Sequence, residues 1–104
     1  SQAQGTDGIK IIVEMEKRNM VYQTAVAEIL DSAKRSVGDK TSVILVFQAS
    51  GIEIDNNLNF VSFQAPPEFC LKALMDKLLY LPAVRIPAQR ILRKRGISFD
   101  TTAE

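Results

Sequence analysis

The strongest constraint on the fold is a run of apolar residues at helical spacing between residues 20 and 37. Side chains three or four positions apart share one face of a helix, and that face has to be buried. Gly38 and Asp39 then supply a stop signal. Residues 9–15 are rich in β-branched side chains, which suits a strand, but no turn signal separates them from the run, so we expect them to extend the helix. The expected apolar face comprises Val21, Ala25, Val26, Ile29, Leu30, Ala33 and Val37.

Strand character is found in the next part of the chain. Residues 41–47 are β-branched and aromatic and lie between polar neighbours, which predicts a buried strand. After Gly51, residues 52–54 alternate between apolar and charged, and the Asp-Asn-Asn sequence at 55–57 tolerates a turn. Strand character resumes over residues 58–63. We expect the runs on either side of the turn to pair as an antiparallel hairpin.

A Pro-Pro pair at residues 66–67 breaks the chain, and helical patterns follow. The first runs from residue 68 to Pro82, and the second begins near Pro87 and runs to Gly96. Ile97, Ser98 and Phe99 are expected to form a last strand. The predicted fold class is therefore α+β, with a small three-stranded antiparallel sheet packed against helices.

The 104 residues contain no His and one Cys, which limits the chemistry that they can perform. The commonest general base and metal ligand is missing, and one Cys cannot form an internal disulfide, a redox pair or a thiolate cage. We therefore expect no enzyme, no catalytic residue, no metal and no cofactor, with Cys70 as a buried structural thiol. No apolar run approaches the roughly 20 residues that span a bilayer. Residues 1–8 are expected to be a flexible lead-in or linker remnant, and residues 9–104 one domain.

Charge is unevenly distributed although the net charge is only +1. Residues 69–99 contain 7 basic residues and 1 acidic residue. Such a stretch could contact phosphates, but no exposed aromatic side chains for base stacking are interleaved with it. A solvated cationic surface for an acidic protein partner is the other interpretation. The clustered residues are Arg85, Arg90, Arg93, Lys94 and Arg95.

Several segments resemble the C-terminal periplasmic domain of TolA proteins, within the TonB/TolA C-terminal class. They are the helix that contains Tyr22, residues 40–46, residues 69–74, Leu81-Pro82 and, above all, residues 91–99. In some members of the family a Cys in the first strand pairs with one in the second helix. The first of these positions is Ser42 here, which leaves Cys70 without a partner.

The resemblance implies a periplasmic protein-interaction domain of an inner-membrane-anchored protein of the Tol–Pal system, which maintains the outer membrane and acts in cell division. Its implied partners are TolB and Pal, and colicins or the minor coat protein of filamentous phages could exploit it. No nucleic acid and no direct membrane contact are expected.

Strand addition to a sheet edge is the physically reasonable way for such a domain to bind a peptide. We expect the edge at Gly96, Ile97, Ser98 and Phe99, with Arg93, Lys94 and Arg95 attracting the partner. The competing edge contains Leu58, Phe60 and Ser62. A small nucleic-acid-binding domain that uses residues 85–95 is the alternative function.

Overall fold

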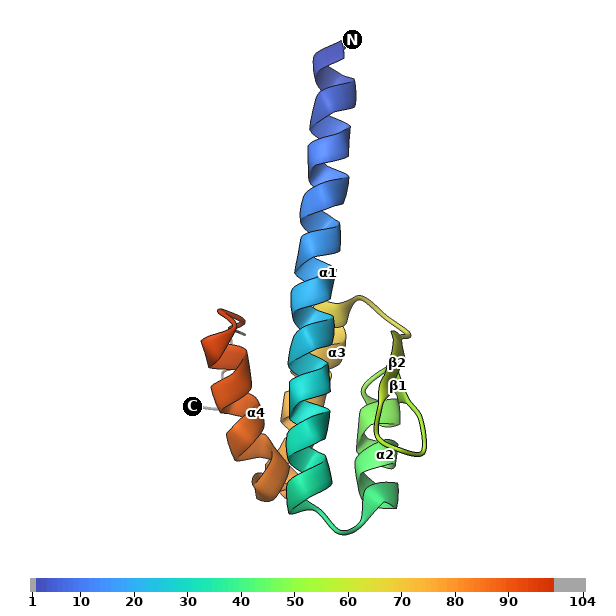
Figure 1. Cartoon of the computed structure of the whole chain (residues 1–104), viewed down its shortest axis with the longest axis vertical. Helices are drawn as coiled ribbons and strands as arrows, with labels where there is room; N and C mark the ends of the chain where they lie inside the picture. Colours follow the sequence, from blue (N-terminus) through green and yellow to red (C-terminus); the bar gives the residue numbers. More distant parts are fainter. Residues whose placement is uncertain (1, 99–104) are drawn as a thin grey trace.

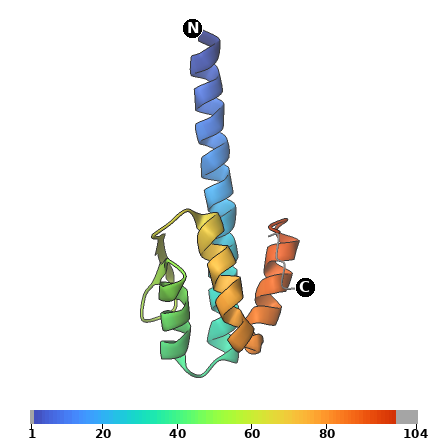
Figure 2. The ribbon, with the colours of Figure 1, turned by 180° about the vertical axis from the view of Figure 1, so that it is seen from behind.

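The computed structural model describes the backbone of residues 2–98 and the side chains from residue 8 onward. Four helices and one hairpin form the fold, as Figure 1 shows. The lower half of the first helix lies at the centre, and its upper half projects alone. Figure 2 shows the third helix beside it, with the fourth helix on one flank and the second helix and hairpin on the other. In chain order the elements are α1 (Gln2–Ser36), α2 (Lys40–Ala49), β1 (Ile52–Ile54), β2 (Phe60–Phe63), α3 (Pro67–Lys77), the short 3₁₀ helix η1 (Leu78–Tyr80) and α4 (Pro82–Lys94).

One hydrophobic core forms around the lower half of α1. Most of the expected apolar face is buried there, with Ala25, Val26, Ile29 and Ala33 fully inaccessible to solvent, whereas Val21 is exposed. α4 covers one side of this face with buried residues at successive turns, and α3, α2 and the hairpin cover the rest. Their core residues are Val84, Ala88 and Leu92 from α4, Cys70, Leu71 and Leu74 from α3, Leu78 from η1, Val43 and Phe47 from α2, and Ile52, Ile54 and Leu58 from the hairpin region.

The strand predicted at residues 41–47 is wrong, because this segment lies in helix α2. Asp39 caps the helix: its carboxylate accepts hydrogen bonds from the backbone N–H groups of Thr41 (3.1 Å) and Ser42 (3.3 Å) and from the Ser42 hydroxyl (2.6 Å). Val43 and Phe47, four residues apart, then point into the core. Capping and burial together outweigh the strand preference of the β-branched residues.

The predicted hairpin is confirmed. β1 and β2 pair antiparallel, with Ile52 opposite Phe63 and a register irregularity after Glu53. In the turn, the Asp55 carboxylate accepts hydrogen bonds from the backbone N–H groups of Asn57 (2.8 Å) and Asn59 (2.9 Å). These bonds, the one from Asn59 above all, hold the pKa of Asp55 below its ordinary value.

The last strand expected at residues 97–99 is not formed by Ile97 and Ser98, and Phe99 lies outside the described residues. Gly96 has φ +72°, and its N–H donates to the carbonyl of Arg93 (3.1 Å). The N–H of Ile97 donates to the carbonyl of Leu92 (2.8 Å). This pair of bonds is a Schellman motif, in which glycine supplies the left-handed residue and the next apolar side chain folds back onto the helix. The segment therefore caps α4.

The fold class prediction is corrected accordingly. The described chain is mostly helical, with a two-stranded sheet in place of the expected three-stranded one. The helical extension through residues 9–15 is confirmed, and so is a helix after the Pro-Pro pair. The last helix begins at Pro82 and contains Pro87, which we expected near its start. The segment expected as a lead-in belongs to α1 from Gln2 onward.

Candidate interaction surface

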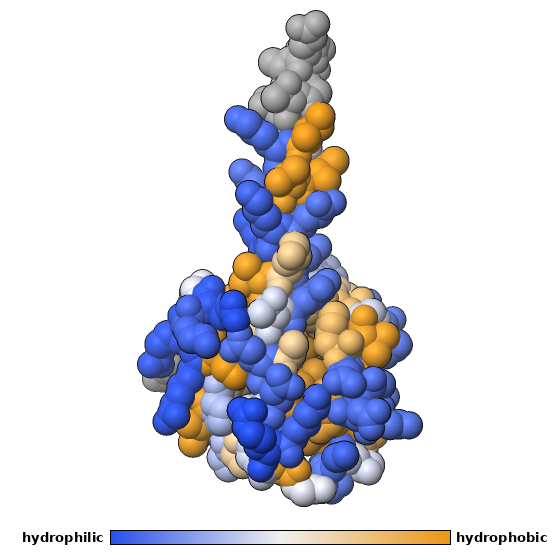
Figure 3. Space-filling view, in the orientation of Figure 1, coloured by the Kyte–Doolittle hydropathy of each residue, from blue (hydrophilic) through white to orange (hydrophobic). Residues whose placement is uncertain are grey.

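The most unusual surface of the molecule is the projecting half of α1. Every side chain from residue 9 to residue 21 is exposed, and the large apolar ones are 39% to 66% accessible. In Figure 3 they form an orange group on the stalk above the rest of the molecule. Large apolar patches of this kind mark interaction sites in soluble proteins. We define the outer face as Ile9, Ile11, Ile12, Val13, Met15 and Met20.

The outer face consists of two rows with Ile12 between them. Ile11 and Met15 are four residues apart and continue the line of Tyr22 and Ile29, which lead into the core. Ile9, Val13 and Met20 are spaced by four and seven residues and form the second row. A helix placed over Ile12 would therefore contact both rows at once.

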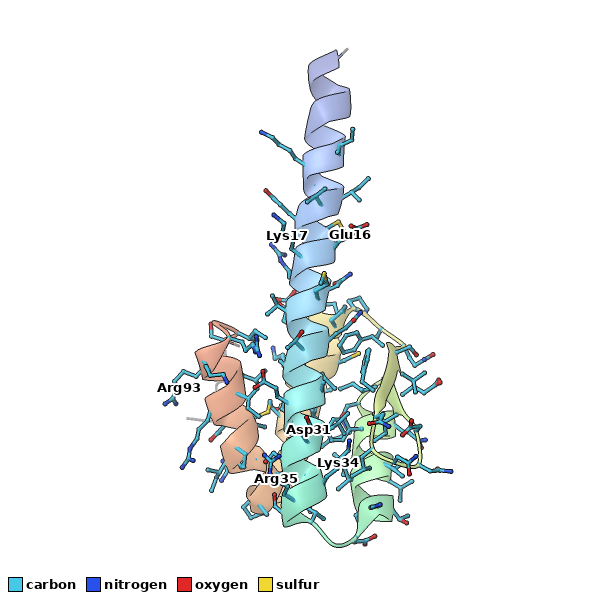
Figure 4. All side chains as sticks on the ribbon, in the orientation of Figure 1. Glu16, Lys17, Asp31, Lys34, Arg35 and Arg93 are labelled. Carbon is cyan, nitrogen blue, oxygen red and sulfur yellow. The ribbon has the colours of Figure 1, made fainter. Side chains whose placement is uncertain are left out.

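Charged residues of both signs accompany the outer face. Lys10, Glu14 and Arg18 follow one another at four-residue spacing and complete the polar side together with Lys17. Glu16 and Lys17 extend from opposite sides of the helix in Figure 4. Because Glu16 is four residues from Ile12, it lies among the apolar rows. The projecting half therefore presents no large field of one sign.

The base of the projecting half meets the start of α3. Tyr22 is the first half-buried residue below the exposed segment. Burial, and after it the Glu68 carboxylate, raise the pKa of the Tyr22 hydroxyl. Phe69, next to Glu68, is exposed. The apolar surface of α1 thus reaches down to an exposed aromatic ring at the N-terminus of α3.

The predicted partner edge at residues 96–99 does not have strand geometry where it is described. Ile97 is half-buried, and its N–H is already bonded to Leu92. Lys94 (3.4 Å) and Arg95 both form ion pairs with Glu28 of α1, so these residues fasten α4 to the central helix. Arg93 extends away from the molecule in Figure 4.

The competing edge is only partly available. Leu58 is fully buried and has φ +63°, and Phe60 is half-buried against the ring of Phe63, with centroids 4.8 Å apart. The N–H of Gln64 donates to the carbonyl of Gly51 (2.7 Å), so in the alternation of an antiparallel ladder the backbone groups of Phe63, opposite Ile52, point away from β1. Val61 lies at the register irregularity. The open edge is therefore short.

The basic cluster is smaller than its sequence indicates. Since Lys94 and Arg95 are paired with Glu28, and Arg85 is half-buried, only Arg90 and Arg93 are exposed and form no ion pair within the described part of the chain. Two such arginines neutralise few phosphates. The structure therefore supports nucleic-acid binding less than the clustering of basic residues in the sequence does.

Cys70 is buried, as expected for a structural thiol. Its Sγ lies 3.4 Å from the carbonyl oxygens of both Gly51 and Ala65 and donates to them. Among residues 2–98, no group of three His, Cys, Asp or Glu side chains is placed to hold a metal ion. In the same part of the chain, no helix has the length and hydropathy of a membrane span.

Sequence reasoning noted the apolar residues 9–15 but assigned them only to the helix. The signal that it missed is the second row of Ile9, Val13 and Met20, which lies off the face that residues 25–33 bury in the core. No protein-family model matches the chain, and neither a curated protein nor a solved structure is significantly similar to it.

Proposed function

We propose that this chain is a protein–protein interaction module that binds through the outer face of α1. The observation that carries the proposal is the concentration of exposed apolar side chains on one projecting helical segment. Burying apolar surface contributes about 25 cal/mol per Å². The outer face is the largest group of apolar side chains that the described residues leave uncovered.

The isolated state of the projecting half supports the same proposal. Most of the stability of helices in proteins comes from the packing of an amphipathic face. In Figures 1 and 2, no other element of the domain packs against the segment from residue 2 to residue 21. A bound partner would stabilise its helical conformation and gain affinity from a preformed apolar face.

Site-specific photocrosslinking in the source cells tests this function. A benzophenone amino acid replaces Met15 in one variant and Lys40, on the exposed start of α2, in a matched control. We expect covalent protein adducts from position 15 and none from position 40. Equal adduct formation at both positions, or no adduct at position 15, would contradict the proposal.

Strand addition at β2 is a second candidate, supported by the outward backbone groups of Phe63. Binding of TolB or Pal in the periplasm, with colicins or phage coat protein as competitors, remains a prediction from the resemblance. Titrating the domain with the N-terminal peptide of a TolB protein tests it. Amide shifts concentrated on residues 61–63 would support it, and their absence would remove this candidate.

A further inference from the structure

We infer that the partner of the outer face is a second copy of this chain, and that the projecting halves of two α1 helices pack antiparallel in a homodimer. This inference rests on the proposed function, because it names the occupant of the same surface. The direction of the apolar rows, the charge of the segment and the self-complementary apolar face support it.

The direction of the apolar rows determines the orientation of the partner helix. Leu30 lies eighteen residues beyond Ile12, about five turns of 3.6 residues, so it points in the same direction as Ile12. Leu30 is buried inside the domain. A parallel partner over Ile12 would continue into the space that the domain occupies, and its own domain would collide there. An antiparallel partner places the two domains at opposite ends.

The upper part of the outer face fixes the register. Ile9, Ile11, Ile12, Val13 and Met15 are centred on Ile12 along the helix. Antiparallel pairing of this cluster with its copy places the symmetry axis near Ile12, so that Ile9 of each copy faces Met15 of the other. Tyr22, the first half-buried residue at the top of the domain, then lies well away from the axis.

The charge of the segment matches a copy of itself better than a strongly charged partner. Its described side chains include three basic residues (Lys10, Lys17 and Arg18) and two acidic residues (Glu14 and Glu16). A surface made for an acidic or a basic partner would carry mainly one sign. The chain as a whole has a net charge of +1, so two copies repel each other little.

In a symmetric dimer both copies contribute the same apolar face, so twelve exposed apolar side chains would lie in the interface. One helical segment from each copy offers less contact than a standard stable interface, which buries about 1,200–2,000 Å² in total. We therefore expect a dimer that dissociates on dilution.

Sedimentation equilibrium between about 1 µM and about 1 mM protein tests the dimer, a range that brackets weak association. The wild-type chain is expected to change from monomer to dimer across it, and Ile12→Glu to remain monomeric. Lys17→Ala, on the polar side, is the matched control and should dimerise like the wild type. Far-UV circular dichroism checks that Ile12→Glu keeps its domain, because Ile12 lies outside the core.

Two outcomes would overturn the dimer: a wild-type monomer at all concentrations, or an Ile12→Glu variant that still dimerises. If the wild type is monomeric but position 15 still gives photocrosslinks to another protein, the inference fails while the proposed function stands. If neither association nor crosslinks are observed, both fail.

Introduced cysteines test the orientation, since the native Cys70 is buried. Ile12→Cys lies near the proposed axis and should form an intermolecular disulfide under mild oxidation, whereas Asn19→Cys, exposed and two turns further along the same line, should not. Both positions would crosslink in a parallel pair, so efficient crosslinking at residue 19 would overturn the antiparallel arrangement.

Discussion

The two halves of α1 belong to one continuous helix and carry apolar side chains at comparable density, yet they have opposite environments. The core-facing apolar side chains from Ala25 to Ala33 are covered by α3, α4 and the hairpin, whereas those from Ile9 to Met20 are covered by nothing in the described part of the domain. An amphipathic pattern therefore shows that a helix needs a packing partner. It does not show whether that partner is part of the same chain.

Replacing one isoleucine in each half of α1 with alanine should give the largest difference in the free energy of unfolding between the two halves. Ile29→Ala removes a fully buried side chain and should lower the free energy of unfolding by about 2–5 kcal/mol. Ile12→Ala should change it by less than about 0.5 kcal/mol in dilute, monomeric protein. Urea unfolding of both variants measures this difference. Similar losses would mean that the projecting half also packs within its own domain.

The C-terminal cap of α4 provides the next test, because α4 covers the buried half of α1 and not the projecting half. Gly96 has φ +72°, so Gly96→Ala should destabilise the domain by about 1–2 kcal/mol. Gly38→Ala is the control: no atom lies within 4 Å of the added Cβ, and Gly38 is not in the left-handed region. Thermal unfolding should separate the two variants. An unchanged melting temperature for Gly96→Ala would contradict the Schellman cap.

The ion pairs of Glu28 should give a smaller difference in stability between the buried and the projecting half of α1. Glu28→Gln removes contacts with Lys94 and Arg95 and should cost about 0.2–1 kcal/mol, less at high salt. Glu14→Gln, on the projecting half, should have no effect, since Glu14 forms no ion pair within residues 2–98. Denaturation at two ionic strengths provides the measurement. A salt-independent loss would show that Glu28 acts through packing.

Acidification should produce the smallest effect, again on the domain and not on the projecting half. The hydrogen bond from the Ser42 hydroxyl above all lowers the pKa of Asp39 below 3.8. A carboxylate with a lowered pKa stabilises the folded state above its ordinary pKa, and this stabilisation is lost as the pH falls through the lowered value. Asp39→Ala should therefore reduce stability at pH 7 and flatten its decline below pH 4. An unchanged acid profile would indicate that the cap is not formed in solution.

The sequence predicted the hairpin and the long helix well, since turn residues and helical periodicity are local signals. The strand predictions failed at residues 41–47 and 97–98 for a common reason. In both places a strand-like composition is controlled by one neighbouring residue, Asp39 as an N-cap and Gly96 as a C-cap. Cap geometry depends on which backbone groups lack partners, and composition alone does not reveal this.

The candidate surface was harder to predict than the core. Periodicity places Ile11 and Met15 in line with Ile29, so from sequence the same partner is expected for all three. Only the three-dimensional arrangement shows that α3 and α4 do not reach the projecting half. The edge predicted at residues 96–99 depends on a last strand that Ile97 and Ser98 do not form.

The reactivity of the buried Cys70 thiol would report local opening of the fold. Its Sγ is hydrogen-bonded to the carbonyl oxygens of Gly51, which precedes β1, and Ala65, which follows β2. A Cβ added at Gly51 would lie 3.2 Å from this sulfur. A thiol reagent can therefore reach it only while the hairpin separates from α3. The rate of labelling, compared with the rate of global unfolding, would show whether the hairpin opens independently of the helices.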